Sequence, residues 1–310
     1  MRISTAWSQQ LNVKAMQNQQ AKMVKTELQL ASALKNLTPA DDPVAAAKAL
    51  SLDSTLAQAT QYQENINAAK TNNTLEDSTL SNAVDVLQRA RDLAVQSLNS
   101  GTLQDTDKQA IGHEIDQILG NMQGLANTTN ASGEYIFSGY QTKTAAFKEA
   151  IPATAPKTYD YKGGTEQRSL QVSADRQIAD SDPGSDVFAF KDVNGNAQNI
   201  FNALSTFREA LANPNPATDQ AVLTKVLNDL DSGLQTITAT QAKTGARLNA
   251  LDVQQNQNEK YMVDMKSSLS NIQDLDYAEA MSRFNQQETT LQAAQQSFSK
   301  VQKLSLFDYL

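Results

Sequence analysis

The sequence predicts a mainly α-helical protein, an elongated nested helical bundle that carries a small β-rich insertion. Its twelve glycines are uneven, since none precedes Gly101 and none follows Gly245. Glycine disfavours the interior of helices, so glycine-free ends favour long helices at both termini. Ten of the eighteen aromatic residues instead lie between Tyr135 and Phe207, where glycines also cluster. This central segment has the composition of short strands and turns.

The first 36 residues contain neither glycine nor proline and are predicted to form one helix. At 1.5 Å per residue this helix would be about 50 Å long. Polar residues such as Gln20 and Glu27 occupy the intermediate positions of its heptad pattern. One thin apolar seam therefore runs along the helix, formed by four residues at intervals of seven: Met16, Met23, Leu30 and Leu37.

A boundary is predicted at residues 38–43, which read TPADDP. Asp42 is suited to cap a new helix with Pro43 at its first position. The next helix extends to about Leu98, with a possible interruption at residues 71–74 and an end at Gly101. Its apolar face consists of Leu80, Val84, Leu87, Ala94 and Leu98.

A third helix is predicted around residues 111–125, where the amphipathic pattern is clear. Apolar residues step by four, three, four and three, at Ile111, Ile115, Ile118, Met122 and Leu125. The short connection at Gly101 favours antiparallel packing of this helix against residues 80–98.

The insertion is predicted to contain strands at residues 135–137, 158–161, 170–172 and 187–190. Gly163 and Gly164 fit a hairpin turn between two of them. Helices resume at Ile200, break at Pro214–Pro216 and then continue towards the end of the chain.

The last helical segment again carries a thin seam, which changes phase at residues 274–276. Before this point the seam consists of Met262, Met265, Leu269 and Ile272. After it, apolar residues recur at intervals of seven, at Tyr277, Phe284, Leu291 and Phe298.

Helices with one apolar stripe at opposite ends of a chain can satisfy each other by pairing as a coiled coil. The predicted interface sets Met16, Met23, Leu30 and Leu37 against Tyr277, Phe284, Leu291 and Phe298. Three parts follow: a terminal coiled-coil domain (1–43 plus 263–310), a helical core domain (44–132 plus 197–262) and a β-rich outward domain (133–196).

Several classes of function are disfavoured by composition. The chain has no cysteine, which excludes disulfides and thiol catalysis, and one histidine, His113, which is predicted to be exposed. A net charge of −8 disfavours nucleic-acid binding, although residues 1–36 hold five basic residues and one acidic residue. Neither a membrane span nor an apolar leader of the secretory type is expected, so export would need a route without signal cleavage.

The terminal segments are rich in uncharged amides, which favours self-association. Residues 1–36 hold nine Gln or Asn and residues 254–302 hold fourteen. Amides both donate and accept hydrogen bonds and do not repel one another when copies stack. Two groups of carboxylates could form acid–base or metal sites: Asp41 with Asp42, and Asp274 with Asp276 and Glu279. Their positions at helix starts favour capping, so no cofactor and no enzymatic activity are expected.

Residues 32–47 resemble the N-terminal core of the flagellin superfamily, in which a long helix precedes two aspartates, here Asp41 and Asp42. Residues 87–96 are similar to a later signature of that core, with Arg89 and Arg91. Residues 245–251, 274–280, 292–294 and 304–307 look like the C-terminal core. Pro43 and the middle segments 133–142, 161–164 with Arg168, and 183–188 resemble the hook-associated members of the superfamily.

The resemblance implies a structural role in the bacterial flagellum, at the junction of hook and filament. The terminal helices would form an inner coiled coil, residues 44–130 and 200–262 a middle layer, and the insertion the outside. A ring of copies would contact flagellin and the hook-side junction protein, hook-associated protein 1. Export in an unfolded state through the type III apparatus is implied, from cytoplasm to cell exterior. A dedicated chaperone would hold the C-terminal helix, for which Val301, Leu304 and Phe307 are the candidates.

Two alternatives remain open at this point. The chain could be a minor flagellin of the filament, since the core motifs are shared. The aromatic residues of the insertion could also form a glycan-binding or hydrolytic module displayed on a helical stalk.

Overall fold

The computed structural model describes residues 2–98, 104–150, 156–212 and 219–307. The chain forms two compact units, one made of residues up to 59 together with residues from 260 onward, the other of residues 60–259. Two long helices, α2 (Pro43–Leu98) and α6 (Asp219–Gln273), contribute to both units. Within the described ranges the fold is mainly helical with small strand pairs, as the sequence predicts.

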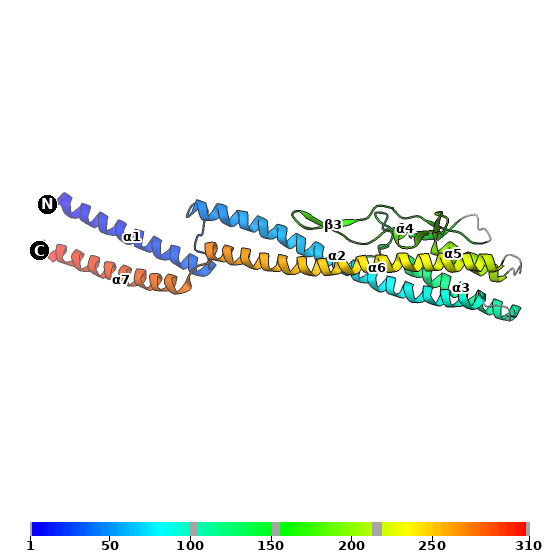
Figure 1. The fold of residues 1–310 in the computed structure, drawn as a ribbon. Helices are drawn as coiled ribbons and strands as arrows, with labels where there is room; N and C mark the ends of the chain where they lie inside the picture. The colour runs from blue at the N-terminus through cyan, green and yellow to red at the C-terminus, as the bar shows by residue number, and fades with distance from the viewer. Residues whose placement is uncertain (1, 99–103, 151–155, 213–218, 308–310) are drawn as a thin grey trace. The chain divides into compact units, whose positions relative to one another are not determined.

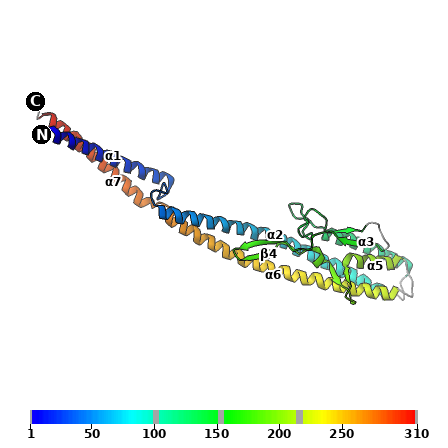
Figure 2. The same cartoon turned by 90° about the horizontal axis from the view of Figure 1, so that it is seen from above.

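The first unit is built on α1 (Arg2–Ser32) and α7 (Tyr277–Phe307). These helices lie side by side in both views, with the two chain ends at the same end of the pair (Figures 1 and 2). The two terminal helices are therefore antiparallel partners, in agreement with the predicted pairing.

Helix α1 ends four residues before the predicted limit, because the chain turns at Ala33. This residue has a φ of 61°, the left-handed conformation that rarely continues a helix. The next residue, Leu34, forms an isolated antiparallel bridge with Asp274. Flanking hydrogen bonds run from Lys35 N to Gln273 O (2.8 Å) and from Leu275 N to Ala33 O (3.0 Å). Leu37, predicted to lie on the helical seam, lies beyond the helix.

Helix α2 begins as the sequence predicts. Pro43 is its first residue, and the Asp42 carboxylate accepts hydrogen bonds from Val44 N (3.1 Å) and Ala45 N (3.0 Å). Such a cap satisfies backbone donors that have no partner within the helix.

The predicted interruption of this helix at residues 71–74 is wrong. Asn73 is fully buried, and its amide donates to the carbonyls of Ala69 (2.8 Å), Ala179 (3.1 Å) and Asp180 (3.1 Å). Thr71 and Thr74 donate to carbonyls one turn earlier. The polar residues that suggested a break are thus hydrogen-bonded within a continuous helix.

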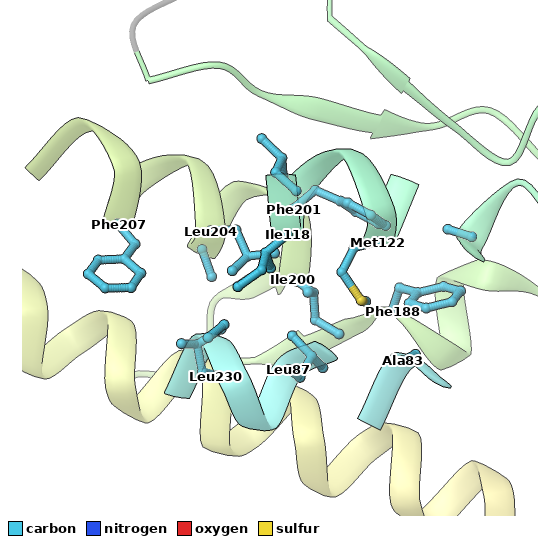
Figure 3. Packing of buried hydrophobic residues seen from close by; sticks show 14 of the residues in the cluster. Ala83, Leu87, Ile118, Met122, Phe188, Ile200, Phe201, Leu204, Phe207 and Leu230 are labelled. Carbon is cyan, nitrogen blue, oxygen red and sulfur yellow. The ribbon is translucent and has the colours of Figure 1, made fainter. Parts of the chain in front are cut away.

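The second unit is a helical bundle of α2 and α6 with α3 (Asp105–Ala126) and α5 (Ile200–Ala212). Both predicted stripes face its core, since Leu80, Leu87 and Ala94 of α2 are buried, as are Ile115 and Met122 of α3. Figure 3 shows residues of all four helices converging on one cluster. The predicted packing of α3 against residues 80–98 is confirmed by this cluster.

The insertion contains three separate antiparallel strand pairs. They are β1 (Phe147–Glu149) with β2 (Tyr159–Tyr161), β3 (Ser169–Ser173) with β4 (Arg176–Ala179), and β5 (Ala189–Lys191) with β6 (Ala197–Asn199). Representative partners are Phe147 with Tyr161 and Leu170 with Ile178. One short helix, α4 (Gly184–Val187), precedes β5.

Two local predictions in the insertion are wrong. Residues 135–137 form no strand beyond a single bridge between Tyr135 and Thr129. Gly163 and Gly164 do not close a hairpin, because β2 pairs with β1 and not with β3. They allow close approach of two loops: Gly164 N donates to Ser138 O (2.9 Å), and a Cβ on Gly163 would lie 2.8 Å from the Cα of Ser138.

The insertion shares the core of the helical bundle. The rings of Phe137 and Phe147 contact Phe188 edge to face, with centroids 5.2 and 5.8 Å apart, and Phe147 lies 4.6 Å from Phe201 of α5. Farther along, the β3–β4 hairpin covers a second, smaller cluster on α2 and α6. The predicted division into three domains stays a prediction.

The predicted break at residues 274–276 is confirmed, since α6 ends at Gln273 and α7 begins at Tyr277. Asp276 caps α7 by accepting from Ala278 N (2.9 Å) and Glu279 N (3.1 Å). The breaks predicted at Gly101 and at Pro214–Pro216 lie outside the described residues. None of the helices in the described ranges combines the length and apolar content that a membrane crossing needs.

Replacing Phe201 with alanine is expected to lower the free energy of unfolding by about 3–5 kcal/mol, because a fully buried ring would leave a cavity. Urea denaturation followed by circular dichroism measures the change. As a control, alanine at exposed His113 of α3 should change it by less than about 0.5 kcal/mol. Equal effects of the two substitutions would contradict the placement of this core.

Candidate assembly surface

The contact between α1 and α7 is a narrow coiled-coil seam in which polar residues alternate with apolar ones at several positions. On α1 the seam consists of half-buried Met16, Gln19, Met23 and Leu30 and of buried Thr26. On α7 it consists of buried Ala280 and of half-buried Phe284, Gln287, Leu291, Ala294 and Phe298, at alternating steps of four and three. Met16 and Phe298 line the same groove between the helices. This spacing is the heptad pattern in which each side chain enters a gap of the partner helix.

Seven of the eight predicted interface residues are at least partly buried in the first unit, whereas Tyr277 is 54% exposed. The Tyr277 hydroxyl nevertheless donates to Leu30 O at 3.4 Å. Leu37 does not join the seam and lies in the connection to α2. The role of these residues in assembly stays a prediction.

Polar side chains occupy several seam positions, but not those expected. Gln20 and Glu27 are exposed, and their places in the seam are taken by Gln19 and Thr26. The Gln19 amide donates to the main-chain oxygen of Gln287 at 3.5 Å. Among the described residues, the buried Oε1 of Gln287 has no hydrogen-bond partner. A polar layer of this kind weakens a helix pair and defines its register.

A second apolar face lies on the opposite side of α1. It consists of Trp7, Leu11, Val24 and Leu28, which are 65%, 46%, 43% and 53% exposed. In the 3.5-residue repeat of the seam, these four residues lie on the half of the helix that faces away from it, within about 50° of the opposite side. We call them the outer face of α1. Neither α7 nor any other described element covers it, although exposed apolar groupings of this kind mark interaction sites.

The two aspartates of the N-terminal motif have different structural roles. Asp41 accepts hydrogen bonds from Lys25 Nζ, Leu37 N (3.1 Å) and Thr38 N (3.0 Å) and so ties the connection to α1. The hydrogen bond from Lys25, with that from Thr38, lowers the pKa of Asp41 to about 2. Asp42 caps α2.

The two arginines of the later motif connect helices of the second unit. Arg89 forms a two-point contact with Glu114 of α3 (2.6 and 3.0 Å), and Arg91 bonds Asp231 of α6 (2.6 Å). These pairs are exposed, so each contributes about 1 kcal/mol or less to stability. Their geometry indicates a role in helix register.

A buried polar cluster, which sequence reasoning missed, fixes the insertion to the bundle. Glu76 of α2 has no exposed area, and its Oε1 accepts from Asp182 N (3.0 Å). Arg247 of α6 bonds the Asp182 carboxylate, while its Nη1 lies 4.0 Å from Glu76. Nearby, Asp180 is paired with Arg168. Three segments far apart in sequence thus meet around one arginine and two carboxyl groups.

The Glu76 carboxyl is therefore unusually easy to protonate. Burial, together with the neighbouring Asp182 carboxylate, raises the pKa of Glu76 to about 8, although Arg247 acts in the opposite direction. Its Oε2 has no hydrogen-bond partner among the described residues. The sequence contained one indication of this cluster, because Arg247 lies in the segment 245–251 that resembles the flagellin C-terminal core.

No reaction centre emerges from the described residues. His113 is exposed, as predicted, and no group of three or more His, Asp or Glu residues in the described ranges could hold a metal ion. The aromatic residues that suggested glycan binding, such as Phe137, Phe147 and Phe188, are fully buried. Val301, Leu304 and Phe307 lie on the helical backbone of α7, and their side chains lie outside the described residues.

Paired terminal helices and a helical bundle with a small insertion define a flagellin-type protein. Comparison with family models agrees: residues 3–142 match the bacterial flagellin N-terminal helical region, and residues 227–310 match the C-terminal helical region. Flagellar hook-associated protein 3 of Escherichia coli is 31% identical over 99% of both chains. The chain therefore belongs to the family of flagellar hook-associated protein 3.

Two further comparisons define this relationship. A flagellin of Bacillus subtilis is 27% identical over 68% of this chain and 66% of its own length. The crystal structure of flagellar hook-associated protein 3 from Legionella pneumophila has the same fold, with a TM-score of 0.63, 20% identity, and coverage of 71% of this chain and 98% of that one. The E. coli hook-associated protein 3 matches nearly the whole chain, including the insertion, whereas the flagellin matches about two thirds of it. This difference supports the hook-associated family over filament flagellin.

Substituting Gln287 with leucine is expected to stabilise the α1–α7 pair by about 1 kcal/mol, because an amide whose buried oxygen has no partner among the described residues is replaced by apolar area. Hydrogen exchange of amides in α7 measures the effect. The matched change of exposed Gln286 to leucine should leave exchange nearly unchanged. Faster exchange in the Gln287 variant would contradict the seam assignment.

Replacing Glu76 with glutamine is expected to remove a pH dependence of stability. The folded protein keeps a proton on Glu76 that the unfolded chain releases near its ordinary pKa of 4.5. Raising the pH from 4.5 to 8 should therefore destabilise the wild type relative to the variant, by on the order of a few kcal/mol, and the difference should level off above pH 8.

Urea titrations at several pH values test this expectation. Asp85→Asn, at an exposed site on the same helix, removes one acidic group and should leave the profile parallel to that of the wild type. If the Glu76 and Asp85 variants show the same profile, the buried cluster does not hold a proton.

Proposed function

We propose that the chain is a structural component of the bacterial flagellum that joins the hook to the flagellin filament. Membership of the hook-associated protein 3 family supports this role. The structural observation that carries it is the outer face of α1, since α7 occupies only one of the two apolar sides of this helix. A helix with two opposite apolar faces is suited to lie between its own partner and a neighbouring subunit.

The expected partners follow from this role. Copies of the chain would pack as a ring, with flagellin on one side and the hook-side junction protein, hook-associated protein 1, on the other. Before export the protein would be cytoplasmic, with a chaperone on the C-terminal helix and passage through the type III apparatus. After export it would lie outside the cell, at the junction. The narrow seam, which includes the polar residues Gln19, Thr26 and Gln287, supports this order, because each terminal helix is stabilised only where a neighbour covers its apolar stripe.

The proposed role needs no catalysis. Interactions between packed helices suffice to transmit force and to join the different subunit arrangements of hook and filament. The E. coli relative is named a flagellar hook-associated protein. The partial match to a flagellin supports the minor-filament alternative less well than the full-length match supports the junction role.

Deletion of the gene is expected to leave cells with hooks but without filaments, and with flagellin released into the medium. Electron microscopy and an immunoblot of the culture supernatant measure this. Long filaments in the deletion strain would contradict the junction role. Immunogold label along whole filaments of the parent strain would favour the minor-flagellin alternative.

Complementation tests the outer face of α1 directly. A variant with Val24→Asp and Leu28→Asp should be expressed and exported but should fail to restore filaments, since both residues are exposed within one chain. The control Val193→Asp, 71% exposed in the turn between β5 and β6, should restore them. Restoration by both variants would show that the outer face is not needed.

A further inference from the structure

The first unit contains an apolar groove where the end of α1, the connection and the start of α2 meet the end of α6. Its volume is about 550 Å³, and it is lined mainly by Leu34, Leu37, Pro39, Ala46, Leu50 and Ile272. Leu50 is 72% exposed at its rim. The groove is therefore large enough for one or two apolar side chains and remains open within one chain.

An apolar side chain of matching size is displayed elsewhere on the same unit. Trp7 is the only tryptophan of the chain and is 65% exposed on α1, and Leu11 lies one turn later. Tryptophan buries 150–250 Å² when it is enclosed and is among the residues that dominate interface energies. An exposed tryptophan beside a leucine at i+4 is a typical helical anchor for a hydrophobic groove.

We propose that Trp7 and Leu11 of one copy insert into the groove of a second copy of this chain. The proposal rests on the proposed function, because it specifies one contact by which copies would pack. Leu37, which the sequence placed in the seam with α7, then belongs to this contact between copies.

A chain cannot fill its own groove. Helix α1 is continuous from Arg2 to Ser32, and 25 residues separate Trp7 from its end. At 1.5 Å per residue the two points are about 38 Å apart, whereas Leu34 of the groove follows immediately after the helix. The occupant must therefore come from another molecule.

The charges at the two sites are complementary, which favours a second copy as the occupant. Lys14 lies on the same side of α1 as Trp7 and Leu11, and it is exposed. Asp53 lines the groove, and exposed Asp42 lies at its edge, before Pro43. A basic, apolar helix face thus matches an acidic, apolar groove, and such pairing selects partners and orientation.

Tryptophan fluorescence of the full chain provides the first test, because Trp7 is the sole tryptophan. As the protein concentration rises and sedimentation shows association, the emission maximum should move to shorter wavelengths as Trp7 leaves water. Association without this shift, or a chain that stays monomeric up to its solubility limit, would overturn the proposal.

The groove is tested with a matched pair of variants on α2. Leu50→Arg places a charge at the groove rim and should weaken association about tenfold or more. Val44→Arg introduces the same charge at a site that is 66% exposed and outside the groove lining, and it should leave association unchanged. Both sites are exposed, so neither variant should impair folding. Equal effects of the two variants would contradict the groove as the docking site.

A charge exchange identifies the partner. Lys14→Glu alone and Asp53→Lys alone should each weaken association, because like charges would then meet. The double variant carries the pair in reversed order and should recover most of the lost affinity. Failure to recover would exclude this docking mode.

Outcomes for this contact and for the function are separable. If the deletion strain lacks filaments while Leu50→Arg restores them as well as Val44→Arg does, the junction role stands and only the groove contact fails. If the deletion strain has normal filaments, the proposed function itself fails.

Discussion

The narrow apolar stripe of each long helix is the constraint on which the rest of this structure depends. A stripe of this kind stabilises a helix only when a partner covers it, because short-range helix propensity is weak. In the second unit four helices and the aromatic residues of the insertion supply that cover, and the core includes fully buried rings such as Phe147 and Phe201. In the first unit α1 and α7 supply it only for each other, with polar residues such as Gln287 in the seam.

The contrast between the units gives each a different task. The second unit is held by dense apolar packing, by interhelical pairs such as Arg91 with Asp231, and by the buried cluster around Arg247. The first unit leaves an outer face and an apolar groove exposed, which are costly in an isolated chain and useful in an assembly.

Much of this fold could be predicted from local patterns in the sequence. The stripe at residues 111–125, the cap at Asp42 and the phase change at residues 274–276 depend on neighbours within a few residues, and each is present as expected. The end of α1 and the continuity of α2 at Asn73 depend on contacts with residues more than a hundred positions away. The Glu76 cluster was missed for the same reason, since its three segments meet only in the folded chain.

The antiparallel pairing of α1 with α7 has a consequence for the order in which the chain acquires structure. The contact between Gln19 and Gln287 closes a loop of 268 residues, whereas the bundle contacts of Arg89 with Glu114 and of Arg91 with Asp231 span 25 and 140. Closing the longer loop costs more chain entropy, and the narrow α1–α7 seam offsets only a small part of that cost with apolar burial. The second unit should therefore form early, and the terminal helices α1 and α7 should pair last. Each molecule then carries unpaired ends until folding is nearly complete.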